Sequence, residues 1–491
     1  MARKLVVSSL AMAVAAGWSL PTAAQTSDHA EIQSELEEMR AQMEAMAQRI
    51  NTLEGQLQVA QAAAQTANSA AQAAQQAASS AQETAEEASE AAEGGSSVEW
   101  KGAPKISGEG GWTFKPRGRL NIDAGFINAP ESTGRTDGFG SEMRRARLGV
   151  EGDIPGGFGY KFEVDFGGGS AEVTDAILTY KDGDLKLSFG QHNTFQSLEE
   201  LSSSRHTSFI ERAAFTDAFG FERRLGVSAQ YGSGDFLVQA GLFSDAIGDI
   251  PNQNWSADGR VVYFPKTGNT QLHFGGSVHL TDLEAGSTVR YRQRPYVHFT
   301  GERFINTNRI AASKELGLGL EAAAISGPFH IAAEGFWQKV DRMAPLADPT
   351  FFGGYVEAGV FLTSGDKRGY KKGTFDRVKP ANPVDKGGMG AWQVNLRYDY
   401  LDLNDAGIVG GQQNAYQLSL NWKPVDYVLF GLNYAHIVYD DAAVAAGTAT
   451  KRHLPDAQSP GRQEAAGALR LDAGVVDYCS GYQTYEPSGP R

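Results

Sequence analysis

The sequence predicts an all-β protein: a transmembrane antiparallel β-barrel of about 16 strands around a water-filled pore, with an N-terminal α-helical coiled coil. Two periodicities support this fold class. Apolar residues recur every 3.5 residues across 32–92, and they alternate with polar residues from residue 117 onward. A third observation excludes a helical membrane protein, because no mature segment of the 491-residue chain contains 18 consecutive apolar residues.

Residues 1–24 have the features of a signal peptide. Arg3 and Lys4 form a positive start, an apolar run follows over 5–17, and small residues precede Gln25. We therefore expect export from the cytoplasm. The alternative is an N-terminal membrane anchor, for which the apolar run is short.

Residues 25–93 are predicted to form a periplasmic coiled coil. Large apolar residues fill the repeat from Ile32 to Leu57, and alanines continue it to Ala92. The first half can drive association of helices, whereas the alanine half buries little surface. A single helix or flexible linker is therefore the alternative for the alanine half. Residues 94–116 begin with Gly-Gly-Ser-Ser and are the expected linker.

Residues 117–441 are predicted to form the outer-membrane barrel. The segment Tyr160–Phe166 places four apolar residues on one face and Lys, Glu and Asp on the other. The same alternation recurs in 120–126, 225–231 and 392–400. This repetition argues against the alternatives, a soluble β-sandwich or a β-helix, because neither needs an apolar outside around a charged inside.

The lengths of the connections also indicate a barrel. Short turns at 156–157 and 182–183 alternate with longer stretches such as 192–222 and 364–389. Short turns at one end and long loops at the other are typical of outer-membrane barrels. We therefore expect both longer stretches at the long-loop end.

Charge and cysteine content exclude several classes of protein. Of the formal net charge of −14, residues 1–100 contribute 4 basic and 13 acidic residues, which leaves 40 basic and 45 acidic residues in the remainder. A nearly balanced main body is not that of a nucleic-acid-binding protein. The single Cys479 excludes an intramolecular disulfide framework.

Arginines recur on the polar faces of the predicted strands. A guanidinium keeps its charge and presents a planar fork of donors that suits phosphate and carboxylate oxygens. A series of them along a pore wall would let an anion step between sites, although pairing with lumenal Asp and Glu is the open alternative. The arginines concerned are Arg144, Arg145 and Arg147 on one strand, Arg223 and Arg224 on another, and Arg290, Arg292 and Arg294 on a third.

The stretch 197–212 lacks a strand pattern. It combines hydroxyl groups with two arginines after a short helix-like start, and it follows directly on a predicted strand. Ser203, Ser204, Arg205 and Arg212 are its candidate anion-binding residues. This position fits a loop that folds into a pore.

At these residues the chain resembles the phosphate-selective porin O and P family of Gram-negative outer membranes. The resemblance covers roughly residues 115–440 and is specific as a family assignment. It rests on the sequences MRRARLG (143–149), YKFEVDF (160–166), SLEEL (197–201), RRLGV (223–227) and YDYLDLND (398–405).

The resemblance implies a homotrimer of sixteen-stranded barrels in the outer-membrane lipid, each pore narrowed by a constriction loop. It assigns Arg144 and Arg145 to a series of pore arginines. It places Ser203, Ser204, Arg205 and Arg212 in the constriction, with Asp165 as a neighbour on the wall. The preferred solute implied by the family is inorganic phosphate or polyphosphate.

The tail, residues 442–491, departs from this pattern. Barrels of this class end in a strand with a terminal aromatic, whereas this chain ends Glu486-Pro487-Ser488-Gly489-Pro490-Arg491. One interpretation is a frameshifted or misjoined tail, because an open edge is not tolerated in lipid. The other is a degenerate closing strand at 467–476.

The leading functional hypothesis is a porin for passive diffusion of small anions through an arginine-lined pore narrowed by 192–222. A general non-selective porin is one alternative. A second is a structural anchor whose coiled coil tethers the envelope, with peptidoglycan as candidate partner. No HExxH or GxSxG motif and no metal-ligand cluster of histidines occurs, so we expect no enzyme, metal site or cofactor.

Overall fold

The computed structural model describes scattered positions between Met43 and Gln82, then residues 97–100, 102–129, 136–249 and 253–441, and the backbone of 464–473. The chain divides into two units, Met1–Gln76 and Ala77–Arg491. The predicted signal peptide and most of the predicted coiled coil lie outside the described residues. Between Met43 and Gln82 the described positions are helical and exposed.

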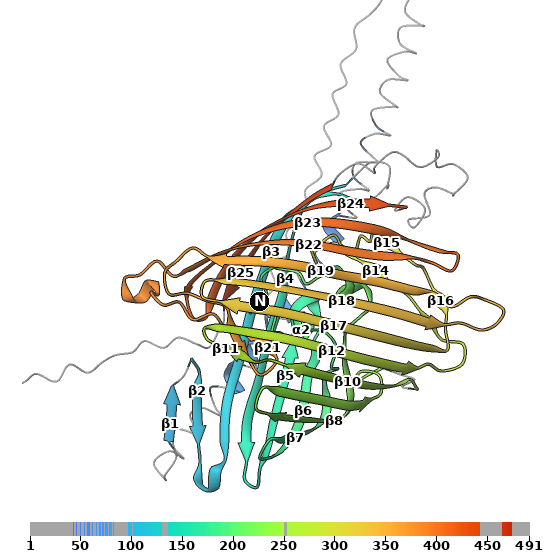
Figure 1. The fold of residues 1–491 in the computed structure, drawn as a ribbon. Coiled ribbons are helices and arrows are strands. Elements are labelled where there is room, and N and C mark those ends of the chain that lie inside the picture. The colour runs from blue at the N-terminus through green and yellow to red at the C-terminus, as the bar shows by residue number, and fades with distance from the viewer. Residues whose placement is uncertain are drawn as a thin grey trace, which may run out of the picture. The chain divides into compact units, whose positions relative to one another are not determined.

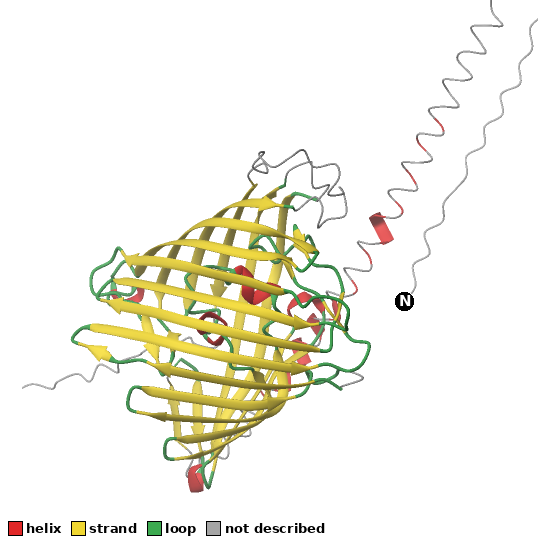
Figure 2. Ribbon diagram, turned by 45° about the vertical axis from the view of Figure 1, so that its right-hand side comes forward, coloured by secondary structure: helices red, strands yellow, loops and turns green. Residues whose placement is uncertain are grey.

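The second unit is built around one large antiparallel sheet of nineteen strands among the described residues. Three of them, β1, β2 and β11, extend its margins, which leaves sixteen long strands that each pair with two neighbours. The last, β25, pairs with β24 along one edge and with β3 along the other. Figure 2 shows these strands curving around an interior in which some of the short helices lie.

The sixteen strands are labelled in part in Figure 1. Their bounds are β3 Thr113–Asn128, β4 Gly138–Ile154, β5 Phe158–Asp165, β6 Glu172–Asp182, β7 Leu185–Asn193, β8 Arg223–Ser233, β9 Phe236–Phe243, β10 Trp255–Tyr263, β12 Thr270–Asp282, β17 Lys314–Ser326, β18 Phe329–Asp341, β19 Thr350–Phe361, β22 Ala391–Asp405, β23 Ile408–Val425, β24 Val428–Asp440 and β25 Glu464–Ala473.

Shorter elements lie at the margins of the sheet and in the connections. The strands are β1 Ser97–Trp100, β2 Pro104–Ser107, β11 Lys266–Thr267, β13 Thr288–Val289, β14 Arg292–Gln293, β15 Ile305–Asn306, β16 Ile310–Ala311, β20 Gly369–Lys371 and β21 Thr374–Asp376. The helical turns are α2 Leu198–Leu201, α3 Ala214–Ala218, η2 Glu109–Gly111, η4 Gly167–Gly169 and η5 Val384–Lys386.

The two faces of the sheet differ as the alternation predicts. Apolar side chains such as Phe162 and Leu320 are 46% and 60% exposed on the outer face. Their strand neighbours Lys161 and Glu321 point inward, and Glu321 is buried. This arrangement reverses that of a protein surrounded by water on all sides, and it suits an outer face in contact with hydrocarbon.

Most connections follow the predicted alternation of lengths. The turns at 155–157, 183–184, 234–235 and 327–328 lie at one end of the strands, and 194–222 and 283–313 lie at the other. In the first of these turns Gly156 and Gly157 have φ near +88° and +87°, a conformation that favours glycine.

The expectation for 364–389 is wrong. The connection 362–390 follows β19, which runs toward the short-turn end, so it enters the interior from that end. Its contacts hold it inside: Gly373 O accepts a hydrogen bond from Arg260 at 3.0 Å, and Phe375 N–H donates to Ser202 Oγ at 3.0 Å. A long connection therefore occurs at each end.

The three long connections fill one side of the interior. Leu198 and Phe215 of 194–222 pack with Phe304 of 283–313 and with inward apolar residues of β17–β24. The ring of Phe215 stacks on Phe336 at 6.0 Å and on Tyr355 at 6.4 Å between centroids. Because this side is packed, the space that remains lies along β3–β8.

Two further expectations concern strands. Arg290, Arg292 and Arg294 do not lie on a barrel strand: they belong to the connection 283–313, in which Arg292 starts the two-residue β14. In the tail, the backbone of 464–473 forms β25, which overlaps the predicted closing strand at 467–476. The rest of the tail lies outside the described residues.

Candidate functional site

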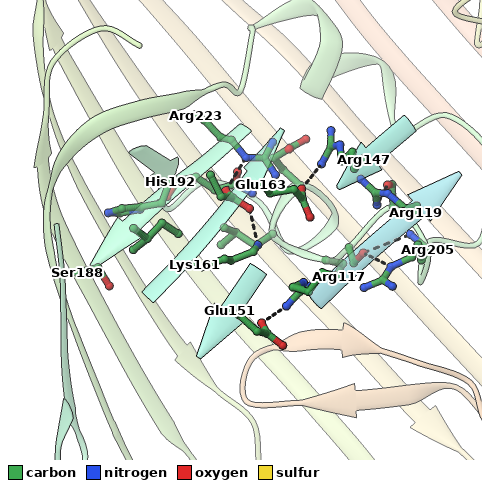
Figure 3. A pocket seen from close by; sticks show the side chains of 18 of the residues that line it. Arg117, Arg119, Arg147, Glu151, Lys161, Glu163, Ser188, His192, Arg205 and Arg223 are labelled. Carbon is green, nitrogen blue, oxygen red and sulfur yellow. Dashed lines mark hydrogen bonds and ion pairs between the residues drawn. The ribbon is translucent and has the colours of Figure 1, made fainter. Parts of the chain in front are cut away.

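A cavity of about 560 Å³ lies between β3–β8 and the connection 194–222. Its lining contains eleven lysines and arginines and four carboxylates, and Figure 3 shows many of these side chains converging on the same space. The cations are Lys115, Arg117, Arg119, Arg145, Arg147, Lys161, Lys186, Arg205, Arg212, Arg223 and Arg377. The acids are Glu151, Glu163, Asp175 and Glu200.

Some of these charges are balanced across neighbouring strands. Arg117 pairs with Glu151, and Lys161 and Arg223 both pair with Asp175, the latter at 2.9 Å. The first two pairs join adjacent strands, whereas the pair of Arg223 with Asp175 reaches across β7 from β8 to β6. Because the cations outnumber the acids by seven, the cavity keeps a strong positive excess after every acid is matched.

Further ion pairs orient Arg147. Its Nη1 lies 3.1 Å from Glu163 Oε1 and its Nε lies 2.6 Å from Asp165 Oδ2. Asp165 also accepts the backbone N–H groups of Ala146 and Gly167. Asp165 is thus behind Arg147 and fixes its orientation rather than lining the cavity.

The inner surface of the connection 194–222 presents hydroxyl groups to the arginines. Arg119 Nη1 donates to Ser204 Oγ at 3.0 Å, and Arg205 Nε reaches Ser203 Oγ at 3.5 Å. The preceding turn α2 is capped by Ser197, whose Oγ accepts the Glu200 N–H at 3.2 Å. Guanidinium and hydroxyl donors side by side form a surface that suits oxyanions.

Arg212 fixes the backbone of this connection. Its Nε donates to the Glu199 carbonyl at 3.0 Å, and its Nη2 donates to the carbonyls of Glu200 and Ser202 at 3.0 and 2.9 Å. Arg397 of β22 anchors the same segment from the wall, since it pairs with both Glu199 and Glu357. Arg212 therefore ties the connection to itself, and Arg397 ties it to the wall.

A second cavity, of about 210 Å³, lies on the other side of 194–222. Arg144 lines it and binds Glu211 through Nε at 3.1 Å, and Arg294 lines it and binds Asp217 at 3.2 Å. Glu200 and Arg212 are the lining residues that the two cavities share. This pair therefore lies at the boundary between the two cavities.

A β-bulge explains how both Arg144 and Arg145 reach the interior. Asn121 of β3 pairs with Arg145, and the next residue Ile122 pairs with Met143, so Arg144 is the extra residue of β4. Strict alternation would point it outward, but the bulge turns it inward while Met143 stays 48% exposed outside.

The predicted site residues fall into four groups. Arg145, Arg147, Ser203, Ser204, Arg205, Arg212 and Arg223 line the main cavity, and Arg144 lines the second. Asp165 orients Arg147. Arg224 lies away from both, beside Asp245 at 3.7 Å and at the edge of a smaller cavity.

Six cations of the main cavity were absent from the predicted set: Lys115, Arg117, Arg119, Lys161, Lys186 and Arg377. The spacing of Arg117 and Arg119 before an alternating strand was a usable signal, as was the inward position of Lys161. Arg377 had none, because it arrives on the connection 362–390, where its guanidinium lies 4.3 Å from the Tyr427 ring.

The charge of the connection 194–222 also depends on whether His206 is protonated. Burial, aided by Arg205 and Lys423, lowers the pKa of His206 to about 2, so this side chain is neutral at ordinary pH.

In the part of the chain that the structure describes, no helix is long and apolar enough to span a membrane. Within the same residues no group of three or more His, Cys, Asp or Glu could hold a metal ion.

Comparison with known proteins agrees with the resemblance seen in the sequence. The family model of phosphate-selective porin O and P matches residues 114–458, more than half of the chain. The chain belongs to this family. Membership places the protein among outer-membrane porins, and its apolar outer face agrees with that location.

Two relatives show how far the similarity extends. An uncharacterized protein of Caulobacter vibrioides is 47% identical over 361 residues, which are 71% of this chain and 73% of that protein. Porin O of Pseudomonas aeruginosa is 26% identical over 369 residues, which are 66% of this chain and 82% of the relative.

Solved structures of porins are also similar. An anion-selective porin from Comamonas acidovorans has 13% identity and a TM-score of 0.46, over 74% of this chain and 100% of that one. The trimer form of OmpT of Vibrio cholerae has 14% identity and a TM-score of 0.46, over 74% and 99%.

Proposed function

We propose that this protein is a porin for passive diffusion of small anions, with phosphate or polyphosphate as the preferred solute. The observation that supports this most is the positive excess of the 560 Å³ cavity, in which eleven cations face four acids. In this proposal the sixteen strands form a closed membrane-spanning barrel, and the connection 194–222 is its constriction. The pairing of β25 with both β24 and β3 supports closure.

The proposed path is off-centre. It follows the wall β3–β8, since the packed connections occupy the side of β17–β24. An anion would enter at Arg144 and Arg294, pass Arg212, and reach the donors of Arg119, Arg205, Ser203 and Ser204. Charged donors beside low-dielectric walls attract anions more strongly than the same donors in water.

Phosphate selectivity separates this proposal from a general non-selective porin. The test is the reversal potential of the purified protein in a planar bilayer under a KCl gradient, followed by titration with phosphate. We expect chloride to be favoured over potassium, with a saturable block of the chloride current by phosphate. Cation selectivity or an absence of block would contradict the proposal and leave a general porin.

The assembly belongs to the proposal as well. We infer a homotrimer, which the family resemblance implies, with residues 25–93 as a periplasmic coiled-coil arm. Two tests follow for a variant that lacks 31–93. Loss of envelope attachment with unchanged conductance would favour the tethering alternative, with peptidoglycan as partner. Loss of the trimer on analytical ultracentrifugation would assign the arm to assembly instead.

A further inference from the structure

Glu200 occupies an unusual position for an acid in a basic pore. Glu200 and Arg212 line both cavities, so this acid lies at the boundary between them. Arg212 Nη1 lies 3.3 Å from Glu200 Oε2, and Arg145 and Arg223 line the main cavity together with this pair. One carboxylate thus shares this part of the cavity lining with three arginines.

The two members of the Glu200–Arg212 pair differ in how firmly they are held. Arg212 donates three hydrogen bonds to backbone carbonyls of residues 199–202, so its guanidinium is fixed in place. Among the described residues, the contact with Arg212 is the one that holds the Glu200 carboxylate. The carboxylate can therefore move aside while the guanidinium stays.

The neighbouring acid shows the opposite arrangement. The Glu199 carboxylate accepts the Ala213 N–H at 2.8 Å and pairs with Arg397, so it serves the fold of the connection. Glu200 has no such second anchor in the described part of the chain. This difference between two adjacent glutamates points to a role for Glu200 at the boundary of the two cavities.

We propose that the Glu200 carboxylate is a tethered anion that occupies the oxyanion site formed by Arg145, Arg212 and Arg223, and that a permeating anion must displace it. This inference rests on the proposed function and makes Glu200 a specificity-determining residue. A carboxylate and a phosphate both present several oxygens to guanidinium donors, whereas chloride presents a single centre. The tethered acid therefore disfavours chloride at this site more than phosphate.

The test compares two isosteric substitutions in the full-length protein, Glu200→Gln and Glu151→Gln. Each removes one negative charge from the same cavity, but Glu151 pairs with Arg117 and does not line the second cavity. If Glu200 competes with the permeating anion, Glu200→Gln lowers the half-blocking phosphate concentration roughly tenfold or more. Glu151→Gln then changes it by about threefold or less, because it alters only the field of the cavity.

Three outcomes are distinguishable in bilayer recordings. A larger effect of Glu200→Gln than of Glu151→Gln supports the tethered anion. Equal effects of the two substitutions, or no effect of Glu200→Gln, overturn the tethered-anion proposal. If phosphate still blocks the wild-type protein in that case, the proposed function stands. A wild type with neither anion selectivity nor phosphate block overturns the proposed function and this inference with it. If Glu200→Gln fails to assemble, Glu200→Ala replaces it in the comparison.

Discussion

Replacement of Arg205 by glutamine should weaken the binding of phosphate in the main cavity. Arg205 lies beside Ser203, and Arg119 donates to the adjacent Ser204, so these four side chains form one donor surface. A hydrogen bond to a charged group contributes about 1.5–3 kcal/mol, and 1.4 kcal/mol is tenfold in affinity, so the half-blocking phosphate concentration should rise roughly 10- to 100-fold.

The matched control is Arg309→Gln. Arg309 is an exposed arginine of the connection 283–313, where it reaches Thr288 Oγ1 at 3.4 Å and lines neither cavity. Its charge is screened by salt over about 10 Å at 0.1 M, so we expect a change of about twofold or less. The assay is phosphate block of the chloride current in planar bilayers. Equal effects of the two substitutions would refute the assignment of Arg205 to the binding surface.

Three further predictions concern charge and assembly. Burial raises the pKa of Glu200 despite the lowering influence of nearby arginines. Its negative charge is therefore lost at a higher pH than for an ordinary glutamate, so chloride-to-potassium selectivity should rise on acidification and Glu200→Gln should flatten this rise. Deletion of the bulged Arg144 should keep the inward and outward faces of β4, whereas deletion of Ala146 should exchange them over part of the strand. We therefore expect the heat-modifiable mobility of the folded protein in electrophoresis to survive the first deletion and not the second. Arg260→Met leaves Glu321 buried without its bidentate partner and should cost about 3–5 kcal/mol in urea unfolding, most of it recovered when Glu321 is also replaced by Met. Selectivity that does not change with pH would contradict the first prediction. Equal electrophoretic behaviour of the two deletion variants would contradict the second. A double substitution whose cost is the sum of the two single costs would contradict the third.

The inner and outer faces of the barrel were predictable because side chains alternate strictly along a strand. Once Phe162 is assigned to the outer face, Lys161 and Glu163 must point inward. The family followed from short motifs, and so did the position of 197–212 beside the arginines. These features depend on residues that are neighbours in sequence or share one strand, so a single sequence contains them.

The bulge at Arg144 was not predictable by alternation. Two adjacent arginines on a regular strand point to opposite faces, so one of them is expected to point outward. The register shift between β3 and β4 makes Arg144 an extra residue, and both arginines point inward. The direction of 362–390 was missed for a similar reason. Which end of the barrel a connection enters depends on the order of every preceding strand, and its inward path depends on distant contacts with Arg260 and Ser202.

Thiol chemistry at Ser203 is a direct test of whether permeating anions pass the donor surface of 197–212. The protein contains a single cysteine, so Ser203→Cys in a Cys479→Ser background offers one reactive thiol in the main cavity. An anionic and a cationic methanethiosulfonate reagent are compared during current recording. We expect the anionic reagent to react faster and to lower anion selectivity. Faster reaction of the cationic reagent, or modification without any change in current, would contradict it.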